Sequence, residues 1–381
     1  MNIILHDAGK HLELAPLTLA KPVAELRMGI LTIKERWQKI LPTAQYFYET
    51  EDYLAEKFPN TSKFDLVINA SAIIYPDTLK EILLLKEGDV LFSKDNWIAK
   101  KGFDITNKVE SKNEVLVINH LWDLFSFNHS AVERDFELLT KNRKSSKISE
   151  SNTIIGNPLH IFLEEGAHVE ATIFNTKSGP IYIDKDAEIM EGSMIRGPFT
   201  LGRGSCVKMG AKIYGATTIG PYCKVGGEIS NSIFQSFSNK GHDGFIGNSV
   251  IGEWCNLGAD TNSSNLKNNY SKVNIYSYAK KEIIKTDVQF LGLIMGDHSK
   301  SGINTMFNTS TVVGFSANIF GGNFPSKHIP SFSWGGADGF VKFDLIKAVE
   351  VAKAMMSRRN VQFSELDLKI FEFLYEKYNL E

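Results

Sequence analysis

An aliphatic residue recurs at every sixth position through the middle of the chain. The unbroken register comprises Ile183, Ile189, Ile195, Leu201, Val207, Ile213, Ile219 and Val225. The residue four places after each aliphatic is usually small, and both lie on the same side of an extended strand. Glycine often follows the aliphatic and gives the backbone the freedom that a tight corner needs. Six-residue sides close a triangular coil of about 18 residues, so the pattern predicts a left-handed parallel β-helix of hexapeptide repeats.

The same spacing continues on both sides of this register, with Leu163 and Val169 upstream and Ile251 and Leu257 downstream. Cys223 and Cys255 fall on the small positions of the repeat. We therefore interpret both thiols as inward-facing corner residues rather than as nucleophiles.

The two flanks of the repeat follow other patterns. Short apolar runs alternate with helical spacings before the repeat, and this alternation indicates βαβ units and a parallel sheet. After residue 335 the spacing is helical, and Ser364 with Asp367 marks the start of a second helix. We expect an α/β domain over 1–147, the β-helix over 148–335 and a helical tail over 336–381, with a polar linker at 141–152.

Composition narrows the classes of partner and compartment. The chain is 43% hydrophobic and 23% charged, as in ordinary globular proteins, and its net charge of −2 offers no basic excess for nucleic acid. The 3 cysteines cannot form a disulfide framework, which indicates a reducing compartment. No apolar run has the length of a membrane span. We expect a cytoplasmic protein without a nucleic-acid or membrane partner.

The repeat is interrupted between residues 227 and 250, and this interruption contains His242. Imidazole exchanges protons near neutral pH, so a histidine in such a break is suited to general-base work. Asparagines on adjacent coils could orient a sugar or polarise a carbonyl group. A surface-loop histidine without a catalytic role is the alternative.

The segment 239–248, followed by Asn256-Leu257-Gly258-Ala259-Asp260-Thr261 and Asn265, resembles the acetyltransferase half of the GlmU-like family. These proteins are bifunctional sugar-1-phosphate nucleotidyltransferases and glucosamine-1-phosphate N-acetyltransferases. The resemblance implies that His242 deprotonates the substrate amine and that the asparagines contact sugar and acetyl group. The substrate-binding residues that it implies are Lys240, Phe245, Asn256, Asn265 and Lys272. Phe245 stands where the family usually has tyrosine.

The N-terminal domain resembles sugar nucleotidyltransferases less closely. The family's glycine-rich phosphate loop corresponds to the segment around Gly9 and Lys10, and its proline–lysine pair to the segment around Lys21. The resemblance implies that these three residues contact the nucleotide phosphates, with Mg²⁺ as cofactor where the domain is active. Asn69 stands where the family has a metal-binding aspartate. A domain that keeps the fold without the chemistry is therefore an equal alternative.

The resemblance implies acetyl-CoA-dependent N-acetylation of an amino-sugar 1-phosphate, glucosamine 1-phosphate, coupled to uridylyl transfer from UTP. The coupled product would be UDP-N-acetylglucosamine, and a homotrimer is expected because cyclic closure suits a triangular prism. Three alternatives stay open: an acetyltransferase with an inactive N-terminal domain, a trimeric scaffold or sugar-nucleotide sensor, and a γ-carbonic-anhydrase-like metal site. The last would use His242 and His298, although the chain shows no complete set of metal ligands.

Overall fold

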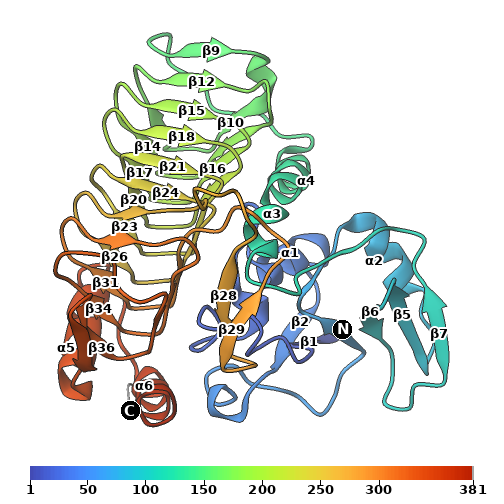
Figure 1. Ribbon diagram of the computed structural model, residues 1–381. Helices are drawn as coiled ribbons and strands as arrows, with labels where there is room; N and C mark the ends of the chain where they lie inside the picture. Colours follow the sequence, from blue (N-terminus) through green and yellow to red (C-terminus); the bar gives the residue numbers. More distant parts are fainter. Residues whose placement is uncertain (380–381) are drawn as a thin grey trace.

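The computed structural model describes residues 1–379 and shows a column of stacked coils beside an α/β domain (Figure 1). Strands of successive coils pair in parallel. Ile181 pairs with Phe199 and Phe199 with Thr217, and each step of 18 residues equals the predicted length of one coil. The eight aliphatic residues of the hexapeptide register are all buried inside the column. The prediction of a parallel β-helix of hexapeptide coils is confirmed.

The column has three sheets, one for each side of the coil. Sheet I contains β10 (Ile161–Leu163), β13 (Ile181–Ile183), β16 (Phe199–Leu201), β19 (Thr217–Ile219), β22 (Ile233–Phe234), β25 (Val250–Ile251), β30 (Ile294–Met295), β33 (Val312–Val313) and β35 (His328–Ile329). Sheet II contains β11 (His168–Val169), β14 (Glu188–Ile189), β17 (Cys206–Val207), β20 (Lys224–Val225), β23 (Asn239–Lys240), β26 (Asn256–Leu257), β31 (Lys300–Ser301), β34 (Asn318–Ile319), β36 (Ser333–Gly336) and β37 (Gly339–Lys342). Sheet III contains β9 (Thr153–Ile155), β12 (Ile173–Asn175), β15 (Met194–Arg196), β18 (Lys212–Tyr214), β21 (Glu228–Ser230) and β24 (Phe245–Gly247), and β27 (Asn262–Ser263) pairs with β32 (Met306–Phe307) farther along.

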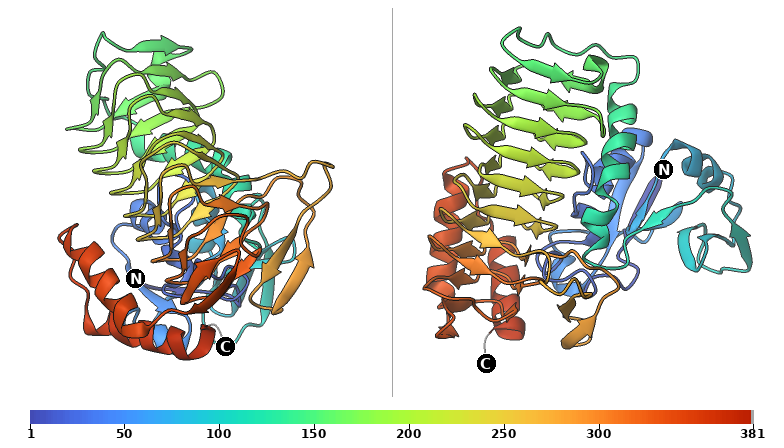
Figure 2. Two further views of the ribbon diagram at one scale, coloured as in Figure 1. Left: turned by 60° about the vertical axis from the view of Figure 1, so that its left-hand side comes forward. Right: turned by 45° about the horizontal axis from the view of Figure 1, so that its top comes forward.

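One coil carries a long insertion. Val250 pairs directly with Ile294, so the chain between them leaves the column and returns to it. The excursion contains the antiparallel hairpin of β28 (Asn274–Ser277) and β29 (Glu282–Lys285), which extends beside the N-terminal domain (Figures 1 and 2).

The N-terminal domain has a six-stranded sheet in the order β2-β1-β3-β6-β5-β7. Its strands are β1 (Asn2–His6), β2 (Gln45–Glu49), β3 (Leu66–Asn69), β5 (Asp89–Ser93), β6 (Asn96–Lys100) and β7 (Asn107–Glu110); β4 (Ala72–Ile73) pairs separately with β8 (Leu116–Val117). The helices are α1 (Ile33–Ile40), α2 (Pro76–Leu83), α3 (Asp123–Ser126) and α4 (Asn128–Thr140), and the 3-10 turns of the chain are η1 (Val23–Glu25), η2 (Asp52–Leu54) and η3 (Pro158–His160).

The N-terminal sheet is mixed, so the predicted parallel arrangement describes only part of it. β1 pairs in parallel with β2 and β3, but β6 runs antiparallel to both of its neighbours. The cause is local, because Lys94 at φ 55° turns the chain directly from β5 into β6. A turn this tight can join only antiparallel strands.

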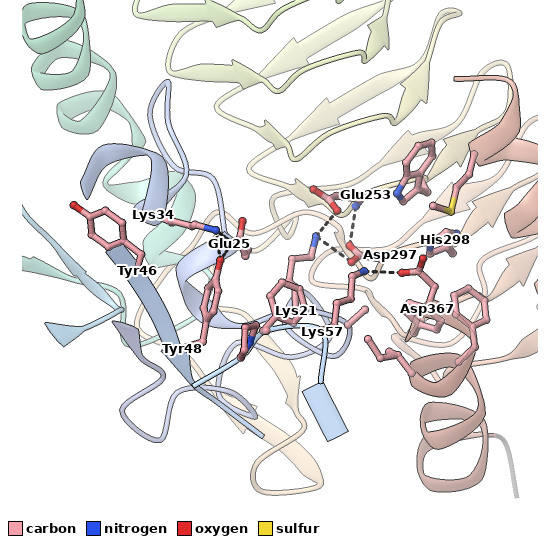
Figure 3. A pocket seen from close by; sticks show the side chains of 18 residues that line it. Lys21, Glu25, Lys34, Tyr46, Tyr48, Lys57, Glu253, Asp297, His298 and Asp367 are labelled. Carbon is pink, nitrogen blue, oxygen red and sulfur yellow. Dashed lines mark hydrogen bonds and ion pairs between the residues drawn. The ribbon is translucent and has the colours of Figure 1, made fainter. Parts of the chain in front are cut away.

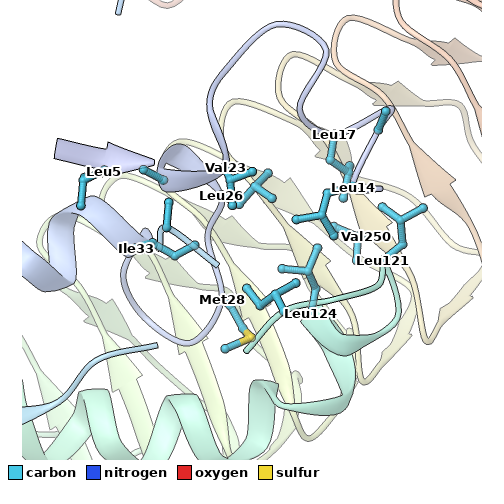
Figure 4. Packing of buried hydrophobic residues seen from close by; sticks show 14 of the residues in the cluster. Leu5, Leu14, Leu17, Val23, Leu26, Met28, Ile33, Leu121, Leu124 and Val250 are labelled. Carbon is cyan, nitrogen blue, oxygen red and sulfur yellow. The ribbon is translucent and has the colours of Figure 1, made fainter. Parts of the chain in front are cut away.

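One hydrophobic cluster spans the boundary between the domain and the column, beside the separate core inside the coils. The segment after β1 supplies Leu14, Leu17 and Val23, which pack in one cluster with Val250 of the β-helix (Figure 4). Polar contacts reinforce this boundary, since the backbone N–H of Arg27 donates to Gln235 Oε1 at 2.7 Å. The N-terminal domain therefore covers part of the outer face of sheet I.

The helical tail comprises α5 (Leu345–Ser357) and α6 (Glu365–Tyr378), as the spacing predicts. Ser364 caps α6 and forms a capping box with Asp367, which confirms the predicted start of this helix. The tail crosses the end of the column to the N-terminal domain, where Lys57 Nζ lies 2.6 Å from Asp367 Oδ1. No helix within 1–379 has the length and apolar character needed to cross a bilayer.

Candidate functional site

His242 lies at the corner between sheets II and III, after β23 and before β24. Its side chain is exposed, and its imidazole has no hydrogen-bond partner within the described part of the chain. The corner backbone beneath the ring is held by Lys240, whose Nζ donates to the carbonyl oxygens of Gly226, His242 and Asp243 at 3.2, 2.7 and 3.0 Å. The ring thus stands free on a fixed backbone.

Lys240 itself points into the column, where it is fully buried beside Val225 of the coil above. Burial lowers the pKa of its ammonium to about 8, against the opposing effect of Asp243 and Asp260. Because the three ammonium protons meet three carbonyl oxygens, none remains for a substrate. The structure therefore gives Lys240 an internal place instead of the predicted substrate contact.

Phe245 and Asn265 come together on the outer face of sheet III. Both cover Gly247, since a Cβ added at this glycine would lie 2.6 Å from the Phe245 ring and 2.7 Å from Asn265 Nδ2. The Asn265 amide donates to Asn248 Oδ1 at 2.8 Å and keeps a second proton free. Lys272 is exposed in the insertion before β28, where its carbonyl oxygen accepts from Lys267 Nζ.

Asn256 lies on a different face from Asn265. It projects from β26 on the outside of sheet II and lines a cavity of about 410 Å³ beneath α5. The same cavity contains Lys224, Lys300, Arg358 and Arg359, which the sequence reasoning did not select. The hexapeptide register does place Lys224 on an outward strand position, but the two arginines come from the tail, and no local pattern connects them with the coils.

The loop after β1 has little of the expected phosphate-binding character. Gly9 is exposed at φ 73° and Lys10 is half-buried, and Gly9 borders a cavity of about 390 Å³. The carboxylate of Asp7 is occupied inside the domain. It accepts from the backbone N–H of Val23 at 2.9 Å and from Thr50 Oγ1 at 2.6 Å.

Lys21, the third predicted phosphate contact, is buried at the boundary with the β-helix. Its Nζ lies 3.1 Å from Glu253 Oε2 and 3.0 Å from Asp297 Oδ2 (Figure 3). Burial opposes the charge on Lys21, but the two carboxylates outweigh burial and raise its pKa. Burial raises the pKa of Asp297 to about 6. The trio lines an interdomain cavity of about 460 Å³, and the structure shows Lys21 joining domains where a phosphate contact was predicted.

The residues around Asn69 do not fit a magnesium site. Asn69 Nδ2 donates to the carbonyl oxygen of Trp97 at 2.9 Å, while Oδ1 accepts from the N–H and hydroxyl of Ser71. Both ends of the amide are therefore used within the domain, whereas Mg²⁺ prefers carboxylate oxygens. Within residues 1–379, no three side chains of His, Cys, Asp or Glu lie close enough together to hold a metal ion.

Comparisons with known proteins agree with the resemblance. Residues 3–144 match the family model described as sugar nucleotidyl transferase. The bifunctional protein GlmU of Methanococcus aeolicus is 34% identical over 122 residues, which are 32% of this chain and 25% of that protein. The bifunctional sugar-1-phosphate nucleotidylyltransferase/acetyltransferase of Sulfurisphaera tokodaii is 31% identical over 146 residues, which are 38% of this chain and 36% of that protein.

Among solved structures, LpxA, a UDP-N-acetylglucosamine acyltransferase from Bacteroides fragilis, aligns with 61% of this chain and 98% of its own. Its sequence identity is 15% and its TM-score 0.24. The resemblance to GlmU-like proteins predicted from the motifs is confirmed, although the chain covers only 25% and 36% of the two curated relatives named above.

Proposed function

We propose that this chain is an acetyl-CoA-dependent N-acetyltransferase whose acceptor is an amino-sugar 1-phosphate, with glucosamine 1-phosphate as the proposed substrate. The observation that carries the proposal is the corner at His242. An exposed imidazole, without a hydrogen-bond partner among residues 1–379, stands on a backbone that Lys240 fixes through two adjacent carbonyl oxygens, those of His242 and Asp243. A general base needs both features, namely a free ring nitrogen and a fixed position.

In the proposed reaction, His242 accepts a proton from the substrate amine while the amine nitrogen attacks the thioester carbonyl of acetyl-CoA. The new C–N bond forms, the C–S bond breaks, and coenzyme A leaves as a thiolate that takes up a proton. The free amide proton of Asn265, or a backbone N–H, would stabilise the developing oxyanion. One such donor is typically worth about 3 kcal/mol.

We further propose that acetyl transfer proceeds without uridylyl transfer by the N-terminal domain. Two features favour this alternative: Lys21 is neutralised by Glu253 and Asp297, and the Asn69 amide is occupied within the domain. The test is a product assay with acetyl-CoA, glucosamine 1-phosphate, UTP and Mg²⁺ that scores free coenzyme A and pyrophosphate separately. Coenzyme A without pyrophosphate is expected, and pyrophosphate release would restore the bifunctional interpretation.

The proposed assembly is a homotrimer packed through sheet III. The N-terminal domain covers part of sheet I and α5 covers part of sheet II, whereas the outer face of sheet III exposes an apolar stripe. The side chains of this stripe are 39–44% exposed: Ile155, Ile173, Met194 and Tyr214. Light scattering on the full chain tests the assembly, and Met194→Glu is expected to shift it toward monomer.

His242→Ala tests the catalytic proposal. Because positioned general bases contribute roughly 10²–10⁴-fold, we expect acetyl transfer to fall by about that factor. The thermal stability should not change, since the side chain is exposed. His129→Ala is the matched control, because it removes another exposed histidine far from the corner, on α4. Retention of wild-type turnover in His242→Ala would refute the proposed role of His242, whereas absence of turnover in the wild type would favour the scaffold or sensor alternative.

A further inference from the structure

The outer face of sheet II carries a continuous polar ladder. Lys224 pairs with Asn239, Asn239 with Asn256, and Asn256 with Lys300. Neighbouring strands lie about 4.8 Å apart, so the ladder places two amides between two ammonium groups over roughly 14 Å. Such a row of donors matches an extended anion better than a single point charge.

The C-terminal end of α5 closes over this ladder and adds two guanidinium groups. Arg358 directly follows the helix, and Arg359 Nη2 donates to Asn239 Oδ1 at 3.0 Å. Together with the ladder they line the cavity of about 410 Å³ described above. Its lining contains four cationic side chains and no carboxylate, although the whole chain has a net charge of −2.

An aromatic wall closes the side of the cavity that faces sheet I. The rings of Phe237 and Trp254 stack with centroids 4.1 Å apart, and Tyr222 stacks on Phe237 at 5.1 Å. Phe237 and Trp254 both line the cavity. An apolar aromatic edge beside a group of cations suits a ligand that joins phosphates to a planar ring.

We propose that this cavity binds the diphosphate group of a nucleotide-bearing ligand. The guanidinium groups of Arg358 and Arg359 match phosphate oxygens in a bidentate geometry, and Lys224 and Lys300 add point charges at the two ends of the ladder. Burial lowers the pKa of Lys300 to about 8, and a bound anion would favour its charged form.

The cavity lies on the same side of the coil as the proposed base. Asn239 precedes His242 by three residues, and an extended chain of that length spans at most about 10 Å. A ligand held by its diphosphate could therefore reach the corner with its other end. This step rests on the proposed function, whereas the binding of the diphosphate does not.

Isothermal titration of the full chain with coenzyme A, UDP or inorganic pyrophosphate tests the proposal. Coenzyme A carries an internal diphosphate and a 3′-phosphate on adenosine, whereas UDP carries a terminal diphosphate on uridine, so the tighter of the two identifies the source. Pyrophosphate reports the contribution of the phosphates alone. Lys224→Met and Arg358→Ala remove exposed side chains and should leave the fold intact. Each is expected to weaken binding by about tenfold to a hundredfold.

Lys347→Met is the matched control, because this exposed lysine lies on the first turn of the same helix and outside the cavity. The Lys347→Met variant should bind the three probes with the affinity of the wild type. The proposal is overturned if none of the three probes binds at millimolar concentration, or if binding is equal in the wild type, Lys224→Met and Arg358→Ala. If acetyl transfer depends on His242 but no diphosphate probe binds in the cavity, this inference alone is refuted. If the probes bind but the protein transfers no acetyl group, only the proposed function is refuted.

Discussion

Lys21 Nζ lies 3.0 Å from Asp297 Oδ2, across the boundary between the N-terminal domain and the β-helix. In the family resemblance this lysine corresponds to a contact with nucleotide phosphates. Here it is almost fully buried and its charge is compensated by Asp297 and Glu253. A residue of the expected nucleotide site thus holds two domains together.

Lys21→Met is expected to destabilise the protein by about 3–5 kcal/mol, because it leaves the buried carboxylate of Asp297 beside the half-buried carboxylate of Glu253 without a cation. Urea unfolding of the full chain measures this loss. Lys80→Met is the matched control, since it breaks an exposed pair with Asp77 that is worth at most about 1 kcal/mol. Adding Asp297→Asn to Lys21→Met should recover part of the loss. Equal stability of Lys21→Met and Lys80→Met would show that the buried pair contributes little.

The stability conferred by Lys240 should depend on pH. Burial lowers its pKa to about 8, from a reference value of 10.5. Between these two values the unfolded chain holds a proton that the folded protein has released, so the contribution of Lys240 to folding rises with pH. Below pH 8 the buried charge of Lys240 destabilises the folded protein to its full extent, and this destabilisation disappears as the pH approaches 10.5.

Urea unfolding of the wild type and Lys240→Met at pH 7, 8, 9 and 10 measures this dependence. The free energy of unfolding of the wild type minus that of the variant should increase along the series. The difference between the two unfolding free energies cancels the contribution of the other lysines, because these lysines are the same in both proteins. A difference that stays constant from pH 7 to pH 10 would contradict the internal position of the ammonium.

Gly247→Ala should impair the proposed sugar site without touching His242. The added methyl group would meet both the Phe245 ring and Asn265 Nδ2 below 3 Å, so both side chains must move. Because Asn265 is also the proposed oxyanion donor, we expect a several-fold higher KM for the sugar phosphate together with a lower kcat. Steady-state kinetics with varied acceptor measure both constants. Gly322→Ala is the matched control, because a Cβ there meets no atom within 4 Å. An unchanged KM would mean that Phe245 and Asn265 do not contact the acceptor.

Cys223 and Cys255 should resist thiol reagents in the folded protein. Both are fully buried, and burial raises the pKa of each thiol to about 12. The reactive thiolate is therefore almost absent at neutral pH. Titration with a chromogenic disulfide should modify these thiols only after denaturation, and catalysis should survive reagent treatment of the native protein. Rapid modification of either thiol in the native protein would contradict the structural interpretation.

The coils were predictable from the sequence because each inward position depends only on the local period. The place of Lys240 could also have been inferred, since it follows Phe234 by six residues and precedes Ile246 by six, and both of these are buried. The family motif instead predicted a substrate contact for this lysine. The partners of Lys21 had no such local pattern, because Glu253 and Asp297 lie more than two hundred residues away in sequence. Similarly, β6 runs antiparallel because of a single turn at Lys94, which the alternation of strands and helices does not encode.

The continuous hydrophobic cluster across the domain boundary affects how the molecule melts. Leu14 and Leu17 of the first domain, Val250 of the coils and Phe371 of the tail belong to the same packed group. Removing any one part would uncover apolar surface on the other two, so their unfolding is thermodynamically linked. Calorimetry should accordingly record a single heat-absorption peak for the whole polypeptide, and substitutions in one part should shift the melting of all three.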